Sequence, residues 1–120
     1  LLSGTLPTSV SEFRLLRALN LRNNRFSGTL PSEIFLGVLQ ELDLGGNRLV
    51  GAIPDSVGAT KDLRVLLLPD NQLSGTVPPQ LVEAKLLSRI DFTNNKLGGE
   101  FPLKTWSLPL VRDLYLSGNP

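Results

Sequence analysis

Residues Leu19–Pro31 read "LNLRNNRFSGTLP", and residues Leu42–Pro54 read "LDLGGNRLVGAIP". The two stretches keep leucine, asparagine, glycine and proline at the same places, whereas the positions between them vary. Self-similarity at a fixed period of about 20 to 50 residues is typical of chains that fold as stacked structural repeats. The constant positions therefore predict the fold, and the variable positions are where binding specificity is expected.

Three residue types recur in step along the whole chain. Successive asparagines of the repeat are 23, 24, 24 and 24 residues apart, and a glycine and a proline keep the same phase. This period predicts a coil of about two dozen residues that is copied along the chain. The three columns are Asn24, Asn47, Asn71, Asn95 and Asn119; Gly4, Gly28, Gly51, Gly75 and Gly99; and Pro7, Pro31, Pro54, Pro78 and Pro102.

Each copy also contains leucines in the order L-x-x-L-x-L, as in Leu16, Leu19 and Leu21. The alternation in the second half of this segment predicts a short strand with one buried face. One such strand cannot bury its leucines alone, but copies stacked side by side form a parallel sheet over a continuous apolar interior. The sequence therefore predicts a solenoid.

After its strand, each copy of the repeat has to turn and return along the other side of the coil. A side-chain amide both donates and accepts hydrogen bonds, so the asparagine column is expected to satisfy the buried backbone of the neighbouring turn. The glycine suits a bend or a close backbone approach, and the proline ends any strand. We expect a second short strand around the glycine, for example over Ser74–Val77, and irregular or 3₁₀ structure on the return.

The full pattern, L-x-x-L-x-L-x-x-N-x-L-x-G-x-[ILVF]-P, resembles the plant-type leucine-rich repeat family and extends over residues 1–120. The resemblance implies a leucine-rich repeat solenoid whose parallel sheet forms the concave face and binds partners there. The family includes ectodomains of receptor kinases, receptor-like proteins and secreted polygalacturonase-inhibiting proteins. It thus implies non-catalytic recognition of a protein or peptide, at the cell surface or outside the cell.

The chain is expected to be a single domain, because one periodic pattern accounts for all 120 residues. It starts with "LLSGTLP", which matches "FSGTLP" from the second residue on, and it stops at "LYLSGNP". Both ends fall within a repeat, so we expect an internal segment of a longer protein. The expected units are a partial repeat 1–15, repeats 16–38, 39–62, 63–86 and 87–110, and a partial repeat 111–120.

Composition argues against several kinds of function. Twelve basic residues stand against 11 acidic ones, a net charge of +1, so no charge excess favours nucleic acid or an anionic membrane. Histidine and cysteine are absent, which removes the commonest catalytic base, any thiol nucleophile and the zinc sites that need them. No apolar run approaches the length of a membrane span. We expect no catalytic residue, cofactor, metal site or membrane insertion in this segment.

The variable positions between the leucines line the open face of the predicted sheet. Neighbours along such a row are about 4.8 Å apart, the spacing of adjacent strands. At that spacing Arg89 and Asp113 are expected to form an ion pair, and Asp91 can meet Tyr115. The candidate partner-binding residues on this face are Asp43, Arg64, Val65, Leu67, Arg89, Asp91 and Tyr115.

Val65 and Leu67 are apolar at positions where the pattern expects side chains in solvent. Apolar anchors ringed by polar groups are typical of the hot spots of protein interfaces. The alternatives are that branched residues simply favour strands, or that another part of the protein covers them. Val65 and Leu67 are therefore candidate residues for contact with a partner.

Two other functions remain open at this stage. An intracellular structural subunit that scaffolds a larger assembly agrees equally well with the lack of cysteines and of N-x-S/T sequons. An enzymatic function would need a catalytic domain, such as a kinase, outside this segment. A signal peptide and a cysteine-paired cap in the flanking sequence would favour the receptor or inhibitor.

Overall fold

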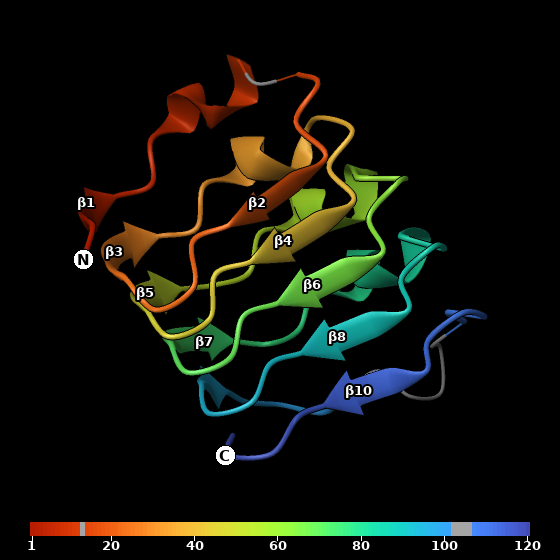
Figure 1. The fold of residues 1–120 in the computed structure, drawn as a ribbon. Helices are drawn as coiled ribbons and strands as arrows, with labels where there is room; N and C mark the ends of the chain where they lie inside the picture. Colours follow the sequence, from red (N-terminus) through yellow and green to blue (C-terminus); the bar gives the residue numbers. More distant parts are fainter. Residues whose placement is uncertain (13, 102–106) are drawn as a thin grey trace.

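The computed structural model describes residues 1–12, 14–101 and 107–120, and Pro102 of the proline column lies outside them. The described chain forms two parallel five-stranded sheets joined by turns and short 3₁₀ helices. Figure 1 shows successive coils stacked from the N-terminus to the C-terminus, with the 3₁₀ helices behind the sheet that faces the viewer. The predicted solenoid with a parallel sheet is confirmed.

The first sheet has the strand order β10-β8-β6-β4-β2. Its strands align without offset between repeats, so that Leu42 pairs with Leu66 and Leu66 with Ile90. The rows predicted from the sequence are therefore rows of neighbours in space. The strands are β2 (Ala18–Asn20), β4 (Glu41–Asp43), β6 (Val65–Leu67), β8 (Arg89–Asp91) and β10 (Asp113–Tyr115).

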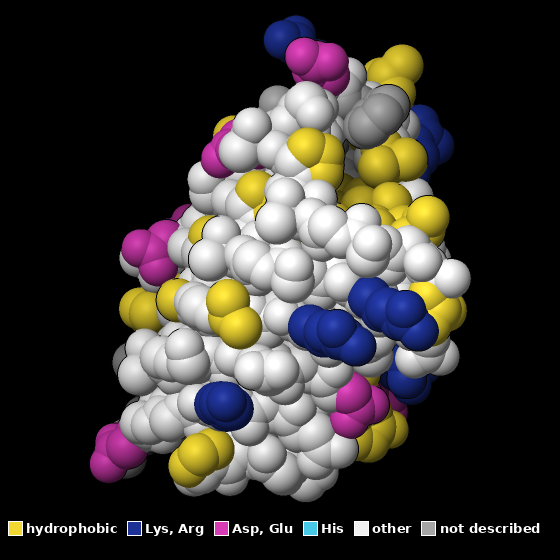
Figure 2. Space-filling view, turned by 90° about the vertical axis from the view of Figure 1, so that its left-hand side faces the viewer, with side chains coloured by type: hydrophobic (Ala, Val, Ile, Leu, Met, Phe, Trp, Pro, Cys, Tyr) yellow, Lys and Arg dark blue, Asp and Glu magenta, His cyan; other side chains and the backbone are white. Residues whose placement is uncertain are grey.

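The second sheet has the order β1-β3-β5-β7-β9 and borders the first along one side of the solenoid, the side that Figure 2 turns toward the viewer. The bounds predicted for its third-repeat strand, Ser74–Val77, were wrong, because the strand begins at Gln72 and ends at Gly75. Gly75 has a φ of +76°, a left-handed conformation that takes the chain out of the extended ladder. The strands are β1 (Ser3–Thr5), β3 (Arg25–Thr29), β5 (Arg48–Gly51), β7 (Gln72–Gly75) and β9 (Lys96–Leu97).

Four short 3₁₀ helices lie on the convex return in the described part of the chain, as the sequence predicts. Each follows a proline of the repeating column, whose fixed φ and missing N–H end the preceding extended segment. Gly58 at the third helix is fully packed against the next coil. The helices are η1 (Thr8–Glu12), η2 (Ser32–Phe35), η3 (Asp55–Ala59) and η4 (Pro79–Glu83).

The core is a continuous column of apolar side chains between the two sheets and the 3₁₀ helices. Leu42, Leu66 and Ile90 of the first sheet have no exposed surface, whereas their counterparts Leu19 and Leu114 at the two ends are half-buried. Each coil thus buries its leucines against the coils on either side, as expected for a solenoid in which a repeat contacts only its neighbours.

The asparagine column links successive coils through hydrogen bonds. Asn71 accepts the backbone N–H of Leu49 on its Oδ1 at 3.0 Å and donates from its Nδ2 to the carbonyl of Leu44 at 2.9 Å. Asn47 and Asn95 repeat this arrangement one coil before and one coil after. The side chain therefore reaches back to the preceding coil while it also closes its own turn.

Candidate functional site

The outward rows of the first sheet form the candidate site, which is the face turned to the viewer in Figure 1. Strand pairing places Asp43, Leu67 and Asp91 next to one another, and Tyr115 beside Asp91. The row two positions earlier on each strand brings together Glu41, Val65, Arg89 and Asp113. All the predicted residues except Arg64, which lies just ahead of its strand, belong to these two rows.

A shallow hollow of about 200 Å³, here called the mid-sheet hollow, lies over strands β2, β4 and β6. Val65 and Leu67 are half-buried in it, so their side chains retain contact with solvent. Three of the predicted residues, Asp43, Val65 and Leu67, are thus brought together, with Glu41 beside them. The hollow combines two apolar side chains with two carboxylates.

Asp43 and Asp91 also have a structural function that the sequence analysis did not assign. The Oδ1 atom of Asp43 accepts the backbone N–H of Gly45 at 3.0 Å, and that of Asp91 accepts the N–H of Thr93 at 2.9 Å. Asn20 does the same in an earlier repeat. These side chains fold the chain after the strand in the manner of an Asx turn. The recurrence of Asn or Asp in this row, at Asn20, Asp43 and Asp91, was the available signal.

Leu67 interrupts that row, and the residue two positions later explains how the fold tolerates it. Pro69 has no backbone N–H, so this turn needs no capping acceptor from residue 67. Position 67 is consequently free of the structural duty that its neighbours Asp43 and Asp91 carry. A leucine here contributes nothing to the turn and shows its side chain on the open face.

The ion pair predicted between Arg89 and Asp113 was wrong. Their strands pair as expected, but the ion pairs among the described residues are Arg22–Asp43 at 3.3 Å and Lys61–Glu83 at 3.7 Å. Arg22 reaches Asp43 across Gly45, where a Cβ atom would lie 2.7 Å from its Nη1 atom. The spacing within a row therefore does not determine which ion pairs form, because a glycine such as Gly45 has no side chain and lets an arginine from another row reach the carboxylate.

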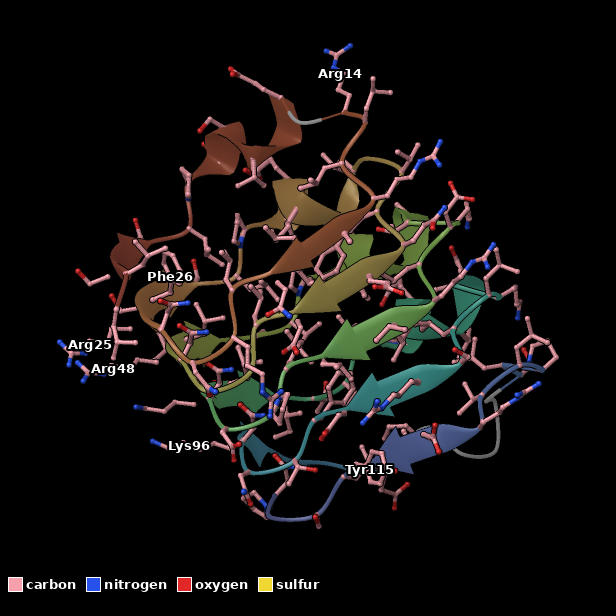
Figure 3. The ribbon with its side chains drawn as sticks, viewed as in Figure 1. Arg14, Arg25, Phe26, Arg48, Lys96 and Tyr115 are labelled. Atoms are coloured by element: carbon pink, nitrogen blue, oxygen red, sulfur yellow. The ribbon has the colours of Figure 1, made fainter. Side chains whose placement is uncertain are left out.

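The contact expected between Asp91 and Tyr115 is likewise not a hydrogen bond within the described chain. Tyr115 lies beside Asp91 in the strand register, but 45% of its surface is exposed and Asp91 accepts from Thr93 instead. Figure 3 shows the Tyr115 ring at the surface near the C-terminal end of the sheet. The ring is thereby left available for a partner.

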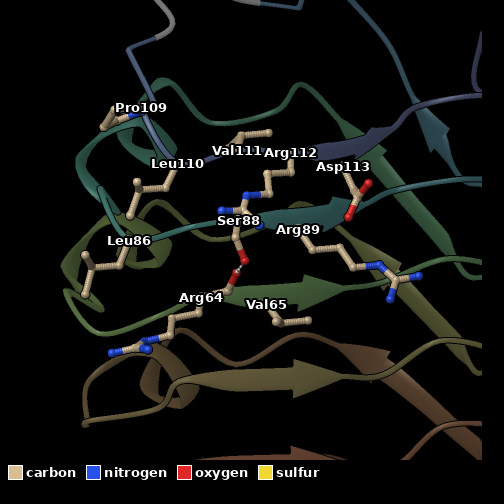
Figure 4. Close-up of a pocket in the computed structure, with 10 residues that line it drawn as sticks. All are labelled: Arg64, Val65, Leu86, Ser88, Arg89, Pro109, Leu110, Val111, Arg112 and Asp113. Atoms are coloured by element: carbon tan, nitrogen blue, oxygen red, sulfur yellow. Dashed lines mark hydrogen bonds between the residues drawn. The ribbon is translucent and has the colours of Figure 1, made fainter.

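A second and larger hollow, of about 700 Å³, lies at the flank of the sheet where strands β6, β8 and β10 begin. We call it the flank hollow. Figure 4 shows Arg64 and Arg112 extending to the same side as Leu86 and Leu110. Of its lining, Arg64, Val65 and Arg89 were predicted, and the others are Leu86, Ser88, Pro109, Leu110, Val111, Arg112 and Asp113.

Leu86 and Leu110 were missed because they lie ahead of the segment that the repeat pattern defines, whereas Arg112 occupies the same position in its repeat as the predicted Arg64. Leu86 and Leu110 immediately precede the first core leucine or valine of their repeats, and Val38 holds the same place earlier in the chain. Leu110 is 50% exposed and Val38 is 38% exposed. An apolar residue recurring just ahead of the core segment was a signal that could have revealed this surface.

The described residues hold neither a metal-binding cluster nor a membrane-spanning helix. Over residues 1–12, 14–101 and 107–120, no three histidine, cysteine, aspartate or glutamate side chains come together to hold a metal ion. Within these ranges, no helix has the length and apolar character needed to cross a bilayer.

The family models and the solved structures that match this chain point to one repeat family. The model of the Leucine Rich Repeat family matches residues 15–36 and 38–59. The ectodomain of the receptor kinase SOBIR1 from Arabidopsis thaliana is 32% identical with a TM-score of 0.90, over 98% of this chain and 65% of that one. The chain belongs to the plant-type leucine-rich repeat family. The comparison with curated proteins gave no match.

Two further structures similar to this leucine-rich repeat chain were solved with bound partners, one of an ectodomain and one of a receptor kinase. That of the membrane receptor kinase GASSHO1/SCHENGEN3 from Arabidopsis thaliana, in complex with CASPARIAN STRIP INTEGRITY FACTOR 2, is 37% identical with a TM-score of 0.93. The Arabidopsis receptor kinase HAESA, in complex with the peptide hormone IDA and the co-receptor SERK1, is 37% identical with a TM-score of 0.92. Each match covers 98% of this chain, which spans only 14% and 20% of those two structures.

Proposed function

We propose that this leucine-rich repeat chain is a non-catalytic recognition segment of an extracellular or cell-surface protein. It binds a protein or peptide on the open face of the first sheet. The contacting residues are Asp43, Arg64, Val65, Leu67, Arg89, Asp91 and Tyr115.

The observation that carries the proposal is the break at Leu67. The turn after β6 does not need residue 67, and a leucine there keeps apolar surface in contact with water. Complete burial of a fully exposed leucine is worth about 1.5 to 3 kcal/mol, and a partner that covers the exposed part of Leu67 gains a fraction of this. Val65 adds a second apolar side chain in the same hollow, and Glu41 and Asp43 supply a polar border. An apolar centre with a charged border is the usual composition of an interface hot spot.

The similar structures support this proposal over its alternatives. SOBIR1, GASSHO1/SCHENGEN3 and HAESA are receptor kinases, and the last two were solved with peptide or protein partners. The intracellular scaffold has no support among them. The residues of this segment give no support for catalysis either, since its serines have no histidine that could activate them.

The size of the face limits what this segment contributes. Five strands give four gaps of about 4.8 Å, a width of about 19 Å. A stable protein interface takes about 800 Å² from each partner. We therefore infer that residues 1–120 supply part of a binding surface that continues onto other repeats.

The test is a selection of random peptides on the immobilised chain, followed by affinity measurements on two variants. Leu67→Asp places a charge in the mid-sheet hollow, and Val50→Asp makes the same kind of change on β5 of the second sheet, where Val50 is 39% exposed. We expect Leu67→Asp to weaken selected peptides at least tenfold and Val50→Asp to leave them unchanged. Peptides that bind Leu67→Asp as tightly as the native chain, or a selection without binders, would refute the proposal.

A further inference from the structure

The flank hollow has a composition different from that of the mid-sheet hollow. Arg64, Arg89 and Arg112 contribute three guanidinium groups, and Asp113 contributes the only carboxylate among its lining residues. Leu86 and Leu110 add apolar surface beside the arginines (Figure 4). The hollow is therefore both cationic and apolar, whereas the mid-sheet hollow has Glu41 and Asp43 at its border.

Backbone hydrogen bonds fix the positions from which the side chains of Arg64 and Arg112 extend. The N–H of Ser88 donates to the carbonyl of Arg64 at 2.8 Å, and the N–H of Arg112 donates to the carbonyl of Ser88 at 2.8 Å. Ser88 also donates from its hydroxyl to the Arg64 carbonyl at 3.2 Å. Arg64 and Arg112 consequently lie two strand spacings apart, about 9.6 Å. The small side chain of Ser88 between them leaves room for a ligand group.

The guanidinium groups of the flank hollow have no anionic partner within the described chain. The ion pairs there are Arg22–Asp43 and Lys61–Glu83, and no side-chain hydrogen bond from Arg64, Arg89 or Arg112 is present. A guanidinium presents five donors in a planar fork that matches a carboxylate in bidentate fashion. The forks of Arg64 and Arg112, which extend to the same side as Leu86 and Leu110 (Figure 4), favour a ligand that is itself anionic and partly apolar.

We propose that the flank hollow binds an acidic segment of a partner protein in polyproline II conformation, in which two carboxylates three residues apart enclose two apolar residues. A polyproline II helix has three residues per turn and rises about 3.1 Å per residue, so positions three apart lie on the same face, about 9.3 Å from one another. This matches the spacing between Arg64 and Arg112. The two residues between the carboxylates then point to either side of that face, and one of them packs against Leu86 and Leu110. The inference rests on the proposed function and specifies the chemistry of its partner.

The test uses synthetic peptides and nuclear magnetic resonance titration of the ¹⁵N-labelled chain at physiological salt. The probe peptide contains Asp-Leu-Leu-Asp between Gly-Ser flanks. Its controls are Asn-Leu-Leu-Asn, which keeps the shape without charge, and Leu-Asp-Asp-Leu, which keeps the charge without the spacing. We expect the probe to shift the amides of Arg64, Ser88 and Arg112, and to bind at least tenfold more tightly than either control.

Charge reversal separates a specific site from general attraction. The variant Arg64→Glu/Arg112→Glu should lose at least tenfold in affinity for the probe and gain affinity for Lys-Leu-Leu-Lys. The matched control Arg25→Glu/Arg48→Glu makes the same charge change on the second sheet, where both side chains point away from the molecule (Figure 3). Equal losses in the two variants would overturn the inference, because they would indicate binding by net charge alone.

The outcomes also distinguish this inference from the proposed function. Leu67 does not line the flank hollow, so Leu67→Asp should leave the affinity for the Asp-Leu-Leu-Asp probe unchanged. A probe that fails to bind, or that binds no better than its controls, overturns the acidic partner but leaves selected peptides that depend on Leu67 unaffected. Selected peptides indifferent to Leu67→Asp would refute the proposed function even if the probe bound at Arg64 and Arg112.

Discussion

Removing the Asn71 side chain tests how the coils are held together. In Asn71→Ala the carbonyl of Leu44 keeps the Nδ2 atom of Asn47 as a donor at 3.0 Å, and that of Leu68 keeps Asn95 at 2.9 Å. The N–H of Leu49 has no such replacement, because Asn71 Oδ1 is its acceptor and the site is buried. One orphaned buried donor costs about 1 to 3 kcal/mol, and the lost hydrogen bonds add about 1 kcal/mol.

The expected cost of Asn71→Ala is therefore about 2 to 4 kcal/mol of unfolding free energy. For a chain of this length that corresponds to a lower Tm by roughly 8 to 16 °C. Urea denaturation followed by circular dichroism measures the free energy, and a thermal scan gives the Tm.

The matched control is the same substitution at the outer end of the column. Asn24 accepts the N–H of Leu2 at 2.9 Å, and Leu2 is 60% exposed, so water can replace the lost acceptor. We expect Asn24→Ala to cost less than about 1 kcal/mol. Equal costs for Asn71→Ala and Asn24→Ala would refute the reasoning, because burial would then not be what makes the column stabilising.

Two further predictions concern the packing of the coils and the turns of the first sheet. Gly58→Ala places a Cβ atom that would clash with the backbone carbonyl oxygen of Gln80, so it should cost about 1 to 3 kcal/mol in thermal denaturation. Gly98→Ala, whose Cβ meets no atom within 4 Å, should cost less, and equal costs would contradict this assignment. Asp91→Ala loses the acceptor for the N–H of Thr93 and should cost about 0.5 to 1.5 kcal/mol, whereas Asp91→Asn should be near neutral in urea denaturation. A full loss in Asp91→Asn would show that charge, not the cap, stabilises this turn.

The solenoid could be predicted because the same physical need recurs in every repeat. Each strand has to bury its leucines, and each turn has to satisfy the hydrogen bonds of its backbone. The same residue types therefore recur five times at a nearly constant spacing. The second strands were placed two residues too late because their position depends on pairing between coils. In β7 the ladder begins directly after the column asparagine, at Gln72, and ends at Gly75, whose φ is positive.

The candidate site could be predicted only as far as the backbone determines it. Strand register fixes which residues are neighbours, so the rows through Val65 and Leu67 follow from the sequence. Side-chain direction depends on local exceptions to the repeat. Gly45 lets Arg22 reach Asp43, and Pro69 frees position 67 from capping the turn. The flank hollow was missed because its apolar lining, Leu86 and Leu110, precedes the strand segment on which the pattern is centred.

The most direct test of recognition by the open face is to map where a selected peptide binds. The measurement is the change in amide chemical shifts of the labelled native chain as the peptide with the highest affinity is added. We expect the largest changes along strands β4, β6 and β8, around Val65 and Leu67, and little change on the second sheet. Changes concentrated on Arg25 and Arg48 of the second sheet, with the rows of the first sheet unaffected, would contradict it.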